Sequence, residues 1–169
     1  MNLFRLVMSF LVLSGCSYAD VNGMQEEHRY ISGKIAAFGE AVERCEKVAA
    51  NREAPPQSLI NKLNNYELEN VRTFLITLNA QLAEDCQKPE LTELAYAIGV
   101  LEGAEVTGKP KQVLENIKPL VFGKETWGLK ERYMQLPENM RKSLGQEEYF
   151  EKPFRDIEIL NVLESGNPP

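Results

Sequence analysis

The stretch ISGKIAAFGEAVERCEKVA, residues 31 to 49, has the pattern that decides the fold. Its apolar positions recur at steps of four, three, four, three and four: Ile31, Ile35, Phe38, Val42, Cys45 and Ala49. This spacing places them on one face of an α-helix that packs against other helices. It predicts a long helix over about 24–51. Gly33 and Gly39 inside it each cost about 1 kcal/mol relative to alanine, and a close helix crossing would explain both.

The same helical spacing recurs along the rest of the chain, interrupted by proline, glycine and asparagine. Ala54-Pro55-Pro56 ends the first helix. Further helices are predicted over about 57–86, 89–107, 110–121, 126–135, 137–144 and 153–164. No stretch has the sustained alternation of a strand, and no solenoid repeat is present. The sequence predicts an all-α fold: a single irregular bundle of five to seven helices with one disulfide.

That disulfide would join Cys45 to Cys86, which both fall at predicted helix ends. A bridge requires the two Cα atoms to lie within about 7 Å of each other. A straight helix over 57–86 would carry Cys86 roughly 40 Å from the start of that helix at 1.5 Å per residue. We therefore expect the chain to bend back near Asn64-Asn65, so that the helix ending at Cys86 runs parallel to the first. Two buried, unpaired thiols are the alternative.

The N-terminal residues have the layout of a secretory signal: Arg5, an apolar run from Leu6 to Leu13, then small residues before a cysteine. The run is too short to span a bilayer, which takes roughly 20 apolar residues in a helix. Leu13-Ser14-Gly15-Cys16 resembles the lipobox of bacterial lipoproteins. The resemblance implies cleavage after Gly15 and membrane attachment through acyl chains on Cys16. An ordinary signal peptide with a free Cys16 thiol is the alternative.

This resemblance divides the chain into a signal peptide over 1–15, a lipidated tether over 16–23 and a helical domain over 24–169. Ser17 is not the aspartate that holds many such lipoproteins at the inner membrane. The outer membrane is therefore the expected location, with the domain facing the periplasm; the inner membrane and the cell surface are alternatives. Disulfides persist in the oxidising periplasm, and a short tether would keep the domain and its partner near the membrane.

Composition leaves few residues for catalysis. The net charge of −6 provides no basic field for nucleic acid, so no nucleic-acid partner is expected. His28 is the single histidine, which leaves little for histidine metal sites or histidine-activated nucleophiles. Adjacent carboxylates such as Glu84-Asp85 and Glu147-Glu148 diverge on a helix. The sequence therefore predicts a protein that is not an enzyme and that holds no cofactor or metal.

An interaction surface is predicted within Lys124–Lys142, where aromatic residues, methionines and cations are mixed. These residue types are enriched at interface cores. The candidates are Trp127, Lys130, Arg132, Tyr133 and Met134. Trp127 and Tyr133 would alternatively plug a small core. A second candidate surface is acidic and is formed by Glu90, Glu93, Glu102 and Glu105. It is either exposed to solvent or faces a basic partner.

The expected function is that of a lipid-anchored adaptor that binds a periplasmic or outer-membrane protein. Its general plan is similar to that of the helical pilotins of secretion systems, and it would offer a groove for an amphipathic peptide helix. An immunity or inhibitor lipoprotein is one alternative, because an acidic surface suits a basic toxin or hydrolase. A cell-wall-active enzyme or its accessory is the other.

Overall fold

The computed structural model describes residues 17–122 and 125–165, so the lipobox residues 13–16 lie outside the described part. Within those ranges the chain forms seven α-helices and one 3₁₀ helix, and no strand. The all-α class and the number of helices agree with the sequence prediction. The elements are α1 (Ser17–Ala50), α2 (Gln57–Leu63), α3 (Leu68–Gly103), α4 (Gly108–Phe122), α5 (Glu125–Gln135), α6 (Glu138–Gly145), η1 (Glu148–Glu151) and α7 (Asp156–Ser165).

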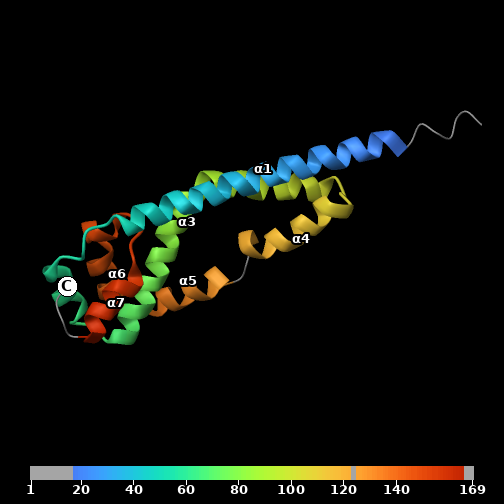
Figure 1. Ribbon diagram of the computed structural model, residues 1–169. Coiled ribbons are helices and arrows are strands. Elements are labelled where there is room, and N and C mark those ends of the chain that lie inside the picture. The colour runs from blue at the N-terminus through green and yellow to red at the C-terminus, as the bar shows by residue number, and fades with distance from the viewer. Residues whose placement is uncertain (1–16, 123–124, 166–169) are drawn as a thin grey trace, which may run out of the picture.

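The two longest helices, α1 and α3, form the frame of the molecule (Figure 1). α3 rises steeply toward α1, then bends and runs back along it in the opposite direction (Figure 1). Pro89 lies inside α3. A proline lacks the backbone N–H, and its ring clashes with the carbonyl four residues earlier, so it kinks a helix. The prediction of a new helix at Pro89 is therefore wrong, because one bent helix continues through it.

The predicted bend near Asn64-Asn65 is confirmed, because α2 ends at Leu63 and α3 begins at Leu68. The Cys45–Cys86 disulfide is also confirmed, with the two Cα atoms 6.1 Å apart. The direction predicted for the helix segment before Cys86 is wrong. That first half of α3 meets α1 at a steep angle rather than running parallel to it (Figure 1), because Pro89 lets α3 turn onto α1 only after the bridge.

Buried side chains form two separate hydrophobic clusters. The first, called the proximal cluster because it includes residues of α1, lies between α1, the second half of α3 and α4. It consists of Ile31, Leu94, Ala97, Ile98, Leu101, Val106 and Leu114. The distal cluster lies between α2, the first half of α3, α6, η1 and α7, and consists of Leu59, Ile60, Leu63, Val71, Phe74, Leu75, Leu136, Met140, Leu144, Phe150, Phe154, Ile159 and Leu160. Of the described helices, only α3 contributes buried residues to both clusters.

Several local expectations need correction. α1 begins at Ser17, so the residues expected to form a tether over 17–23 are helical; those before Gly23 include neither glycine nor proline, so nothing in them stops a helix. Gly33 and Gly39 do not mark a close crossing, because a Cβ added at either would meet nothing within 4 Å. No helix in the described ranges is long and apolar enough to cross a membrane.

Candidate binding crevice

A crevice opens at the C-terminal end of α1, between residues 51–56 and residues 147–152. Residues 51–56 are not helical because Pro55 and Pro56 interrupt the chain before α2. The opposite wall is η1 and its flanking residues. This η1 crevice has a volume of about 600 Å³, and its lining residues are Asn51, Arg52, Glu53, Ala54, Pro56, Glu147, Glu148, Tyr149, Glu151 and Lys152.

Arg52 and Tyr149 join the two walls. The Arg52 guanidinium lies 4.6 Å from the centre of the Tyr149 ring and donates a hydrogen bond to the Tyr149 carbonyl oxygen. The Tyr149 hydroxyl in turn donates to the Glu53 carbonyl oxygen at 3.4 Å. Burial raises the pKa of the Tyr149 hydroxyl, and the Arg52 charge opposes that rise. The two walls of the crevice are therefore linked by a cation-π contact and two hydrogen bonds.

The η1 wall is fixed to the rest of the distal cluster. The Tyr149 ring lies 5.6 Å from Phe150 and 6.0 Å from Phe154, measured between ring centroids. Lys62 on α2 forms an ion pair with Glu147 at 2.5 Å and donates to the Ser143 carbonyl oxygen at 2.9 Å. Aromatic packing and this lysine therefore hold the wall in place before any ligand arrives.

The lining of the crevice has an excess of carboxylates. Glu147 is paired with Lys62, whereas Glu53, Glu148 and Glu151 form no ion pair within the described part of the chain. Of the two cations, Arg52 is held against Tyr149 and Lys152 remains. Such a lining attracts a positively charged group. It is polar, unlike the apolar groove expected for an amphipathic peptide helix.

The lining of the crevice includes neither histidine nor cysteine. No group of three or more His, Cys, Asp or Glu side chains is positioned there, or elsewhere in the described ranges, to hold a metal ion. His28 lies in the N-terminal part of α1, whereas the crevice is at the C-terminal end of that helix.

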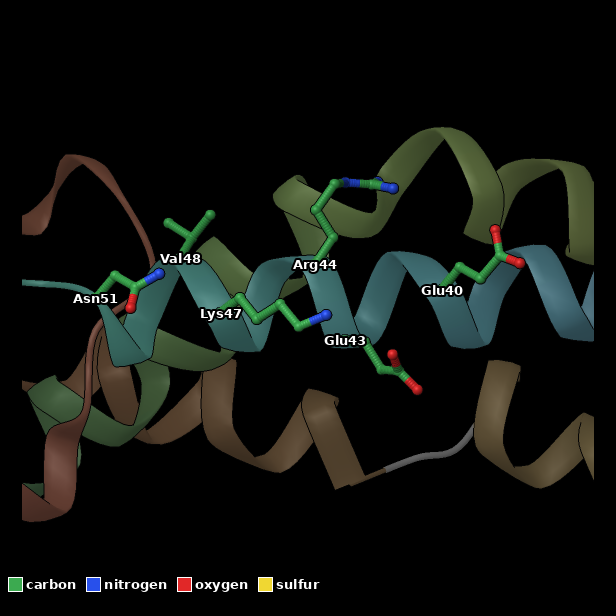
Figure 2. A pocket seen from close by; sticks show the side chains of 6 residues that line it. All are labelled: Glu40, Glu43, Arg44, Lys47, Val48 and Asn51. Carbon is green, nitrogen blue, oxygen red and sulfur yellow. The ribbon is translucent and has the colours of Figure 1, made fainter.

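A second hollow, of about 550 Å³, follows the exposed face of α1 (Figure 2). All of its lining residues belong to that helix or follow it directly: Glu40, Glu43, Arg44, Lys47, Val48 and Asn51. Each glutamate precedes a cation by four residues, a spacing that stabilises solvent-exposed helices. Glu43 and Arg44 point to opposite sides of α1 in Figure 2. This balanced surface needs no ligand to explain it.

Four of the five residues of the predicted interaction surface have described side chains, and these four differ in burial and in their contacts. Tyr133 is half-buried and its ring stacks on Phe74 with centroids 5.8 Å apart, as the core alternative requires. Lys130 lies 3.9 Å from Glu84 in an ion pair. Arg132 and Met134 are exposed, Met134 by 64%. Trp127 lies in α5, and its side chain is outside the described part of the structure.

The acidic face predicted on α3 serves contacts within the chain. Glu90 binds Arg44 at 3.0 Å and Glu93 binds Lys34 at 2.8 Å, which ties α3 to α1. Glu102 pairs with Lys118 on α4. The pKa of Glu90 is lowered by a hydrogen bond from its own backbone N–H and by Arg44, against the opposing effect of burial. Three of the four carboxylates thus form ion pairs within the chain.

Sequence reasoning missed the η1 crevice. Each wall of the crevice does have a feature in the sequence. Pro55-Pro56 marks an irregular segment, and Glu147, Glu148 and Glu151 form an acidic run. What brings them together is the contact between Arg52 and Tyr149, which are 97 positions apart. Local patterns in a sequence carry no information on such a pairing.

The chain matches no protein-family model, no curated protein and no solved structure. The fold and the crevice define an all-α protein, stapled by one disulfide, with an acidic recess at one end.

Proposed function

We propose that this protein is a lipid-anchored binding protein whose η1 crevice receives a positively charged segment of a protein partner. The observation that carries the proposal is the set of three carboxylates, Glu53, Glu148 and Glu151, that line a fixed recess without an ion pair of their own in the described part of the chain. A basic segment would supply the missing charges. Complementary charge also speeds association and excludes acidic competitors.

The anchor rests on the lipobox, Leu13-Ser14-Gly15-Cys16. α1 begins directly after Cys16 and has 34 residues, so at 1.5 Å per residue it is about 50 Å long. The crevice lies at its far end. If α1 stands upright on the membrane, acyl chains on Cys16 would place the crevice up to about 50 Å from the bilayer surface. The partner would then be met farther from the membrane than the short tether predicted from the sequence implies.

Two kinds of partner fit this chemistry. One is a basic segment of a periplasmic or outer-membrane protein that the lipoprotein escorts or retains. The other is a basic toxin or hydrolase that it inhibits, and the acidity of the crevice favours this immunity role as the second candidate. The identity of the bound protein separates the two.

The test uses the mature protein, solubilised in detergent, to capture proteins from a membrane extract of its own cells. The triple variant E53Q/E148Q/E151Q removes the crevice charges, and E40Q/E43Q/E46Q removes three exposed charges from α1 as a matched control. We expect the crevice variant to bind the partner about tenfold more weakly, equal to about 1.4 kcal/mol, and so to capture less of it, and the control to capture as much as the unmodified protein. A synthetic peptide of the captured protein's basic segment should bind with the same ranking in calorimetry. Equal capture by both variants would reject the crevice as the binding site.

A further inference from the structure

The C-terminal end of α1 has few packing contacts of its own. Among the described side chains of this helix, Ile31, Ala41 and Cys45 are the buried ones. Cys45 is 2% exposed and is the last of them. Neither hydrophobic cluster includes a residue of α1 beyond Phe38. On the α1 side, the last turns of the helix, which lead into the crevice wall 51–56, are therefore held to α3 by the Cys45–Cys86 bond and by the exposed Arg44–Glu90 ion pair next to it.

The bond at Cys45 joins the two walls of the crevice indirectly. Residues 51–56 continue directly from α1, whereas Tyr149 on the other wall packs against the distal cluster, to which the first half of α3 belongs. Cys86 lies on α3, shortly before the bend at Pro89. The disulfide thus ties the helix that carries one wall to the helix that supports the other.

Without that bond, the α1 side of the wall keeps only weaker links to η1, whereas the other end of the wall remains anchored by buried Pro55 and by α2, which belongs to the distal cluster. The Arg52 contact with Tyr149 combines a cation-π interaction with hydrogen bonds, and such partly exposed contacts are weak and open locally. The residues of α1 between Cys45 and Asn51 are exposed or only partly buried. They offer no other buried side chain to keep the wall in place.

We propose that the Cys45–Cys86 disulfide is a redox-sensitive clamp that sets the η1 crevice, so that its reduction loosens the α1 wall and weakens binding. The binding part of this inference rests on the proposed function; the structural part does not.

The reductant would be a dithiol. One of its thiolates attacks Sγ of Cys86, which is partly exposed while Cys45 is buried, and the Cys45 sulfur leaves as a thiolate and takes up a proton. The second thiolate of the dithiol then attacks its own mixed-disulfide sulfur and displaces Cys86. Two electrons pass from the dithiol, which becomes a disulfide, to the two cysteines, which become thiols.

Amide hydrogen exchange on the mature protein tests the clamp without any ligand. On reduction with dithiothreitol, the amides of residues 46–53 should exchange about tenfold faster, while those of α7 and α4 stay unchanged. C45A/C86A should exchange quickly without reductant and show no response to it, which controls for other effects of dithiothreitol. Unchanged exchange over 46–53 in the reduced protein would overturn the proposal. Chemical reduction keeps the test valid if the double variant does not fold.

The same samples separate this inference from the proposed function. Binding of a fluorescent hexa-arginine peptide is measured by anisotropy, and the reduced protein should bind it about tenfold more weakly than the oxidised protein, or about 1.4 kcal/mol. Equal affinity in both redox states would overturn the regulatory role. Faster exchange with no peptide binding by the oxidised protein would support the structural clamp and reject the cationic partner.

Discussion

Arg52 is the residue on which the shape of the crevice depends most directly, because its guanidinium contacts the Tyr149 ring and carbonyl oxygen. Replacing it by glutamine removes the charge that opposes the burial of the Tyr149 hydroxyl, so the pKa of that hydroxyl should rise further. The free energy of unfolding should fall by about 1–2 kcal/mol.

Ultraviolet titration of the tyrosines and urea denaturation measure the two effects. K142Q is the matched control, because Lys142 forms an exposed ion pair with Glu138 on one helix. It should change stability by less than about 0.5 kcal/mol. If R52Q behaves like K142Q, Arg52 does not hold the walls together.

Two of the half-buried tyrosines, Tyr133 and Tyr149, should make the stability of the protein sensitive to alkaline pH. Burial raises the pKa of Tyr133 and of Tyr149 above the usual 10.0. A raised pKa in the folded state means that the stabilisation is present below the unfolded value and is lost as the pH rises through the folded one. Stability should therefore fall above about pH 10. Y133F should reduce that loss in denaturation curves measured at increasing pH, and an unchanged slope would contradict the assignment.

At the scale of the elements, the glycines of α1 and α4 have opposite roles. Gly39 lies inside α1, where a Cβ would meet nothing within 4 Å, whereas Gly108 opens α4 with a φ of 65°. G39A should raise the free energy of unfolding by up to about 1 kcal/mol through helix propensity. G108A should lower it by about 1–2 kcal/mol because alanine resists positive φ. Thermal unfolding followed by circular dichroism compares the two, and a loss in G39A would mean that its surroundings are not open.

Most of the elements could be predicted from the sequence, because the apolar stripes are local. The stripe from Ile31 to Ala49 and the break at Asn64-Asn65 lie where the patterns place them. The passage of α3 through Pro89 could not be predicted, because it depends on packing of the second half of α3 against α1. The crevice could not be predicted for the same reason, since its two walls meet only in the tertiary fold.

At the scale of the whole molecule, the proximal cluster includes Ile31 of α1, whereas the crevice lies at the C-terminal end of that helix beside the distal cluster. If Cys16 is acylated, C16S should prevent incorporation of labelled palmitate and move the protein from the membrane pellet to the soluble fraction. Its circular dichroism should remain helical, because the described core lies beyond that residue. A C16S protein that still pelleted with membranes would contradict the anchor.

The central claim, that the η1 crevice is the place where a protein partner binds, is tested most directly by photo-crosslinking in living cells. A benzophenone amino acid is placed at Glu148 in the crevice or at Glu43 on the exposed face of α1. We predict one covalent protein adduct from position 148 after irradiation, absent when E53Q and E151Q are added, and none from position 43. Adducts from position 43 alone, or from neither position, would contradict the account.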